Sequence, residues 1–154
     1  ISELKGAKPS RSGLARLHDA EQAVYDFPHW IYVCGKRYTA KDFPEVTPEA
    51  ALRHQIEVVK TRQVWAKNPE EYFSEMGKIY YCKGLVWLCY NIHQLSSKQG
   101  PFSWAELQRE TNKDTESLTK ILMKLKSDNW NYASINKALP NLYKLADELI
   151  KKYG

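Results

Sequence analysis

Three side chains with metal-binding or nucleophilic chemistry fall within one helical stretch of the sequence. Cys82, Cys89 and His93 lie at positions i, i+7 and i+11, so a helix brings them to one face. Cys89 and His93 have the i, i+4 spacing of a helical metal pair. Because no fourth ligand is evident, we interpret the cysteines as reduced core thiols and His93 as a hydrogen-bonded core residue. We expect no bound metal and no cofactor.

The sequence shows no local signature of an enzyme. The sequence leaves open the hypothesis of a cysteine nucleophile with His29, His54 or His93 as its general base. It contains no local motif typical of such an enzyme. Glu57 and Lys60 stand one residue farther apart than in a Glu-x-Lys nuclease motif, so we interpret them as a surface ion pair. We therefore expect a protein without catalytic residues.

Composition sets the class of protein and the partners that it permits. The chain has 154 residues, 43% of them hydrophobic, which is enough for one domain or two small lobes. A net charge of +5 permits a nucleic acid or an acidic protein surface as partner. Three cysteines without CxxC spacing indicate a reducing, intracellular location in cytoplasm or nucleus. No apolar run reaches the length of a membrane span, so no membrane partner is expected.

The N-terminal part of the sequence contains three basic regions, namely an arm, the tip of a hairpin and a helix. Residues 1–16 read as a flexible basic arm, and residues 17–67 as a lobe. Within the lobe, a short helix precedes a β-hairpin of Trp30–Cys34 and Arg37–Thr39, with Lys36 and Arg37 at its tip. A second helix follows, with Thr47 as its N-cap and Pro48 at its first position. It carries the basic residues Arg53, Lys60 and Arg62 on its surface and Leu52, Ile56 and Val59 on its buried stripe.

Residues 68–154 are predicted to form a helical core. Asn68 is the expected N-cap of a long central helix, either kinked near Gly84 or split there into two helices. Because its C-terminal half is apolar nearly all round, this helix should be the most buried. At the end of the chain, Pro140 interrupts a helical stripe and can begin a fresh helix. That stripe consists of Ile135, Leu139, Leu142, Leu145 and Leu149.

Two amphipathic pieces lie between Phe102 and Trp130. Ser103 and Glu106 have the spacing of a capping box, and the first piece ends near Thr111 and Asn112. Asp114 then caps a second helix that runs through Lys126. Five apolar residues are predicted to be buried together, namely Leu107, Leu118, Ile121, Leu122 and Leu125.

This spacing resembles the helix-turn-helix of winged-helix domains over about residues 78–132. Leu107 is followed by Leu118, Ile121 and Leu125 at the family's intervals of eleven, fourteen and eighteen residues. Asn129 and Trp130 stand where the family often has Gly and an apolar residue, and Asn tolerates the left-handed conformation. The segment "NYASINK" that follows is too short for the wing. The resemblance implies a mainly α fold with a winged-helix-like core beside the small N-terminal hairpin.

The family's docking geometry implies a set of nucleic-acid contacts. Early outward positions of the second helix would meet base edges, and these are Thr115, Glu116, Thr119 and Lys120. Lys113, Lys124 and Lys126 would contact phosphates. Met123 is also expected outward, where methionine is more typical of a protein contact. Arg53, Lys60, Arg62, Lys36 and Arg37 would add contacts from the lobe.

The sequence therefore favours a non-enzymatic nucleic-acid-binding protein, with DNA preferred, in transcription control or in replication and mobile-element biology. The alternative is a protein-interaction module of winged-helix type within a larger complex. One continuous basic face would favour the first, whereas scattered charge with exposed Tyr, Trp and Met would favour the second.

Overall fold

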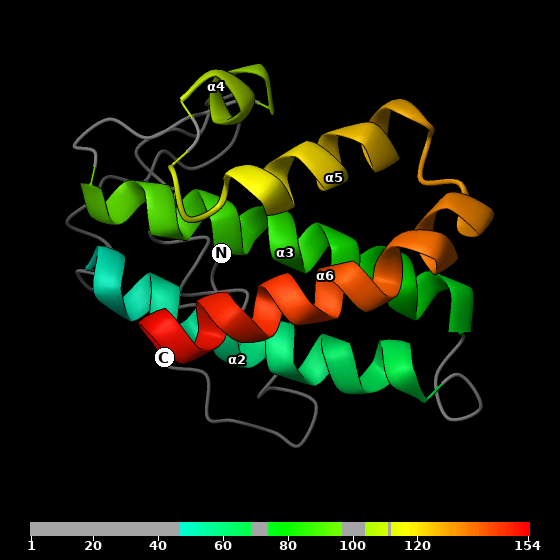
Figure 1. The fold of residues 1–154 in the computed structure, drawn as a ribbon. Coiled ribbons are helices and arrows are strands. Elements are labelled where there is room, and N and C mark those ends of the chain that lie inside the picture. The colour runs from blue at the N-terminus through cyan, green and yellow to red at the C-terminus, as the bar shows by residue number, and fades with distance from the viewer. Residues whose placement is uncertain (1–46, 69–73, 97–103, 111) are drawn as a thin grey trace, which may run out of the picture.

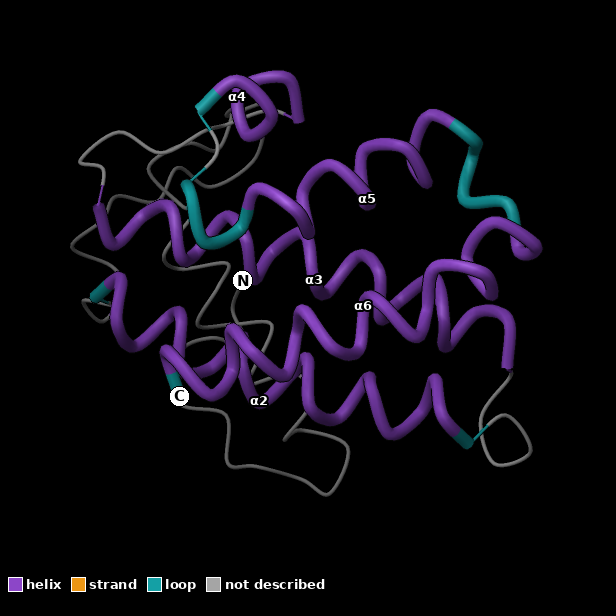
Figure 2. The backbone as a smooth tube through the Cα atoms, in the orientation of Figure 1, coloured by secondary structure: helices purple, strands orange, loops and turns teal. Residues whose placement is uncertain are grey.

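The computed structural model describes residues 47–68, 74–96, 104–110 and 112–154, and these residues are mainly helical (Figures 1 and 2). The elements are α2 (Pro48–Lys67), α3 (Ser74–Ser96), α4 (Trp104–Arg109), α5 (Glu116–Ser127) and α6 (Tyr132–Tyr153). Within those ranges there is no strand, and the predicted mainly α character is confirmed. The basic arm, the first helix, the hairpin with Lys36 and Arg37, and Ser103 lie outside the described residues.

Helix α2 forms as its start signals predict. The backbone N–H of Ala50 donates to Thr47 Oγ1 at 3.2 Å, and Pro48 occupies the first turn, where its missing N–H has no cost. Leu52, Ile56 and Val59 are buried, as the apolar stripe predicts. Asn68, expected to cap the next helix, instead ends α2, with its N–H donating to the Val64 carbonyl at 3.1 Å.

Helix α3 is one continuous helix, so the alternative of two helices meeting at Gly84 is wrong. Gly84 is instead the point where α2 approaches α3 closely. A Cβ at this position would lie 3.2 Å from Arg62 Cδ, and Gln55 Nε2 donates to the Gly84 carbonyl at 2.8 Å. The predicted central position of α3 is confirmed, because most of its second half is buried, including Leu85, Leu88 and Ile92.

Helices α4 and α5 bury the predicted leucines. Leu107, Leu118, Leu122 and Leu125 all belong to the core cluster, and Ile121 is half-buried against it. Helix α4 ends at Arg109, earlier than expected. The N-cap of α5 is Thr115 and not Asp114, because the Asp114 carboxylate is held by the C-terminal turn of α6.

A tight turn links α5 directly to α6. Asn129 has φ 55°, so the prediction that it adopts the left-handed conformation is confirmed, and Trp130 shares it with φ 56°. The N–H of Trp130 donates to the Leu125 carbonyl at 2.9 Å and that of Asn129 to the Lys126 carbonyl at 3.0 Å, which is a Schellman motif. The Trp130 ring packs 6.0 Å from that of Trp104. This packing holds a bulky residue in a conformation that it otherwise avoids.

Helix α6 begins immediately after this turn and runs through Pro140. The Asn131 side chain accepts from the N–H groups of Ala133 and Ser134 and so caps the helix. The expectation that Pro140 begins a fresh helix is therefore wrong. Both Pro140 and Asn136 are exposed, so the Asn136 carbonyl that loses its helical donor faces water.

The helices enclose one apolar core. Figure 1 shows α2 and α5 on opposite sides, with α3 and α6 between them. The core cluster takes residues from α2, α3, α4, α5 and α6, including Ile56, Leu88, Leu122 and Leu142. The predicted division between a lobe ending at residue 67 and a core beginning at residue 68 stays a prediction. None of the described helices has the length and apolar character that crossing a membrane requires.

Candidate interaction surface

The outer face of α5 carries only part of the predicted nucleic-acid site. Lys113, Glu116, Lys120 and Lys124 are exposed, as their expected contacts require. Thr115 and Thr119 were expected on the same face, and that expectation is wrong because both are buried, with exposed fractions of 0% and 2%.

The helical period explains where these two threonines lie. Thr115, Thr119 and Leu122 follow the i, i+4, i+7 spacing of the buried stripe, so α5 turns both hydroxyls toward the interior. Thr115 Oγ1 donates to the Asn112 carbonyl at 3.2 Å, which satisfies its hydroxyl locally. Met123 was also expected outward, but it is half-buried against the core. The periodicity of α5 was a better guide to these residues than the family's docking geometry.

Acidic partners neutralise much of the charge around α5. Glu116 Oε1 lies 2.5 Å from Lys120 Nζ, and this hydrogen bond lowers the pKa of Glu116. Asp114 Oδ2 accepts from Lys152 Nζ at 2.6 Å and from the Tyr153 hydroxyl at 2.5 Å, and both bonds lower the pKa of Asp114. Burial and the Asp114 carboxylate raise the pKa of Tyr153 to about 12. These two ion pairs balance part of the positive charge around α5, and the exposed Lys124 and Lys126 follow them along the helix.

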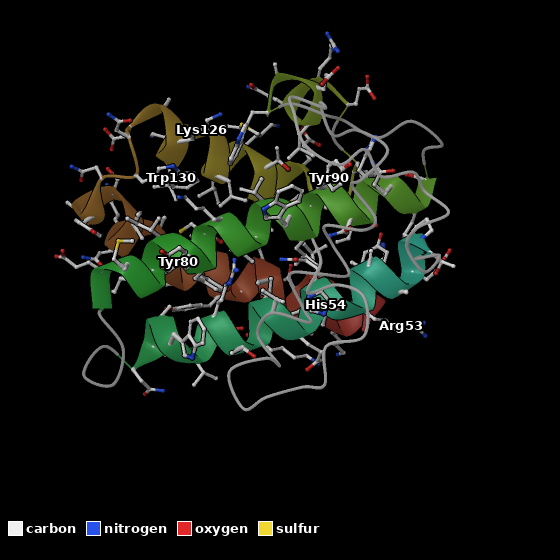
Figure 3. All side chains as sticks on the ribbon, turned by 180° about the vertical axis from the view of Figure 1, so that it is seen from behind. Arg53, His54, Tyr80, Tyr90, Lys126 and Trp130 are labelled. Atoms are coloured by element: carbon white, nitrogen blue, oxygen red, sulfur yellow. The ribbon has the colours of Figure 1, made fainter. Side chains whose placement is uncertain are left out.

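The basic residues of α2 do not join those of α5. Arg53 is exposed, and Lys60 forms the expected ion pair with Glu57 at 2.6 Å. Arg62 is directed at α3, where its Nη1 donates to the Tyr80 carbonyl at 3.2 Å. Because α3 and α6 separate α2 from α5 in the front and rear views, the two basic groups lie on different sides (Figures 1 and 3).

The thiols and histidine of α3 lie in the core. Cys82 and Cys89 are free and fully buried, as predicted, and burial raises the pKa of each thiol to about 12. A thiol with such a pKa is protonated at neutral pH and is a poor nucleophile. His93 is also buried, and its Nε2 lies 3.8 Å from Glu110 Oε2, which is too long for a hydrogen bond. No group of three metal-ligating side chains occurs among the residues described by the structure.

A different surface stands out on α3. Met76, Tyr80, Lys83 and Trp87 are exposed and follow the spacing i, i+4, i+7, i+11, so they form one row along the helix. We call this row the α3 outer stripe. Met76, Tyr80 and Trp87 retain exposed fractions of 45%, 44% and 42%. Figure 3 shows Tyr80 on the side of α3 that faces away from α6.

Comparisons with protein-family models, with curated proteins and with solved structures found no match to this chain. The resemblance of residues 78–132 to winged-helix domains therefore stays a prediction based on residue spacing. What the protein binds has to be inferred from its own surface.

The polar atoms of the α3 outer stripe are available to a partner. The Tyr80 hydroxyl, the Lys83 ammonium and the Trp87 indole N–H form no hydrogen bond or ion pair in the part of the chain that the structure describes. The Trp87 ring packs edge-on against Tyr90, with centroids 5.5 Å apart. This contact restricts the orientation of Trp87, which reduces the entropy lost when the ring is buried by a partner.

The exposure of this stripe does not follow from the pattern of apolar residues in α3. The C-terminal half of α3 is apolar nearly all round, which predicts a central buried helix, and Trp87 lies in that half. Helices α2, α5 and α6 cover its other sides, but the side bearing Tyr80 and Trp87 remains exposed.

Proposed function

We propose that this chain is a protein-interaction module that presents the α3 outer stripe to a partner protein. The exposure of Met76, Tyr80 and Trp87 in one row is the observation that supports the proposal. Tyr, Trp and Met are enriched in the buried centres of protein interfaces, and Tyr and Trp are the most frequent hot spots. Three such side chains in one row are unusual for a surface without a binding role.

The charge distribution also favours a protein partner over a nucleic acid. Thr115 and Thr119 are buried, and the Glu116 carboxylate neutralises Lys120. Such ion pairing lowers the number of lysines available to phosphates, and nucleic-acid affinity depends on the number of phosphates that are neutralised. The described surface thus corresponds to scattered charge with an exposed aromatic row.

The test is capture of proteins from nuclease-treated extract of the source cells, using tagged full-length variants. Tyr80→Ser/Trp87→Ser is compared with wild type and with Lys120→Ser/Lys124→Ser as the matched control on α5. A specific partner should bind wild type and the control, but bind the stripe variant on the order of tenfold more weakly or worse, since hot-spot truncations cost about 2 kcal/mol or more. Circular dichroism checks that wild type and both variants are folded. Identical protein sets captured by all variants would rule out the proposal.

Nucleic-acid binding is a second candidate, favoured by the exposed lysines of α5. Lys113, Lys120 and Lys124 are exposed at positions i, i+7 and i+11, along one side of the helix and the turn before it. Each phosphate contact would release condensed counterion, so the logarithm of affinity should fall with the logarithm of salt by about 0.9 per contact.

Fluorescence anisotropy of labelled duplex DNA at several salt concentrations tests this second candidate. Lys120→Glu/Lys124→Glu should weaken binding and make the salt slope shallower than in wild type. Lys137→Glu/Lys144→Glu, at two exposed positions on α6, is the control with the same change in net charge. If wild type shows no salt-dependent binding to duplex or single strand, nucleic-acid binding is excluded.

A further inference from the structure

The centre of the α3 outer stripe is positively charged. Lys83 lies between Tyr80 and Trp87 in the row and has no ion-pair partner among the residues whose placement the structure gives. Arg62 reaches α3 from α2 and lies beside the same stretch, because its Nη1 bonds to the Tyr80 carbonyl and its side chain passes Gly84. The stripe therefore combines two exposed aromatic rings with the Lys83 ammonium between them.

The shape of the α3 outer stripe determines which kind of secondary structure a partner can pack against it. Addition of a partner strand requires a free sheet edge, and residues 47–68, 74–96, 104–110 and 112–154 contain no strand. The row from Met76 to Trp87 extends about 16 Å along the axis, which is three helical turns. A second helix fits such a row, since side chains at i±3 and i±4 positions interdigitate across a helix pair.

From these observations we infer that the partner contributes an amphipathic helix whose apolar side chains pack on Met76, Tyr80 and Trp87 and whose carboxylates face Lys83. This inference rests on the proposed function and specifies the chemistry of the partner. A basic helix would place like charges against Lys83 as water is excluded, which is unfavourable. A second copy of this chain pairing through the same stripe would bring Lys83 near its own equivalent, which disfavours self-association through this row.

Two synthetic peptides test the charge preference. Both are three-turn to four-turn helices with the same leucine row, and the flanking positions carry Glu in one peptide and Lys in the other. Anisotropy titrations with the full chain should give at least about tenfold tighter binding of the Glu peptide at low salt, and the difference should shrink as salt is raised. Lys83→Glu should abolish or reverse the preference, whereas Lys137→Glu, an exposed position on α6, should leave it unchanged.

The outcomes separate this inference from the proposed function. If Tyr80→Ser and Trp87→Ala weaken both peptides while Lys83→Glu changes neither, the stripe binds helices but the acidic preference is wrong. If neither peptide binds and extract capture still depends on the stripe, the partner is not a helix of this type, and the proposed function stands. If sedimentation shows a concentration-dependent dimer that Trp87→Ala abolishes, the occupant is a second copy and not an acidic partner.

Discussion

Replacing Leu122 by alanine is expected to lower the free energy of unfolding by about 2–5 kcal/mol, the range for leucine-to-alanine changes in packed cores. Leu122 is 1% exposed and belongs to the core cluster that joins α5 to α3 and α6. Alanine would remove three carbon atoms and their dispersion contacts, and the helix backbone restricts how far the neighbours can close the gap. For a chain of this length the melting temperature should fall by roughly 5–20 °C.

Lys124→Ala on the same helix is the matched control for this change. Lys124 is exposed, and alanine has the higher helix propensity, so its effect should stay within about 0.5 kcal/mol. Urea denaturation followed by circular dichroism at 222 nm measures both variants. A loss below about 1 kcal/mol for Leu122→Ala would show that α5 does not pack on the core as described.

Local signals in the sequence predicted much of the fold correctly. Thr47 and Pro48 identified the start of α2 because capping depends on neighbouring residues alone. Leu118, Leu122 and Leu125 were predicted to be buried together because their spacing places them on a single face of a helix. Asn129 stands where the winged-helix family often has Gly, and it adopts the left-handed conformation that Asn tolerates.

The errors occurred where tertiary contacts decide the outcome. Pro140 breaks a helix in isolation, but packing of α6 on both sides of it keeps the helix continuous. Gly84 reads as a weak point in a helix, whereas the contact with Arg62 makes it a site of close packing. Asn68 is a local exception, because its residue type can end one helix or begin another, and its bond to Val64 shows that it ends α2.

The candidate site was less predictable than the fold because exposure depends on which helices cover α3. The sequence identifies Met76, Tyr80 and Trp87 as apolar or aromatic, but core residues have the same composition. The expected site on α5 relied on a family's docking geometry, and the burial of Thr115 and Thr119 removed two of its base-contacting residues. Predicting a function that depends on surface residues therefore requires knowing how the whole domain packs.

A pair of substitutions at Tyr81 is expected to separate the contribution of its ring from that of its hydroxyl. Tyr81 is fully buried in the core cluster, and its ring lies 5.3 Å from that of Tyr143. The hydroxyl has no hydrogen-bond partner among the described residues. Burial is the main cause that raises the pKa of Tyr81, and the nearby Tyr143 and Asp147 raise it further. The hydroxyl therefore remains protonated and neutral at neutral pH.

Tyr81→Ala should lower the free energy of unfolding by about 3–5 kcal/mol, because it leaves a cavity the size of an aromatic ring in the core. Tyr81→Phe keeps the ring and removes a polar group whose burial without a partner costs about 1–3 kcal/mol. We therefore expect the phenylalanine variant to be as stable as wild type or more stable by about 1 kcal/mol. Parallel urea denaturation of the three proteins gives the comparison. A loss above 1 kcal/mol for Tyr81→Phe would mean that the hydroxyl is bonded in solution, to buried water or to the Asp147 carboxylate, and that this bond contributes to the packing of α3 against α6.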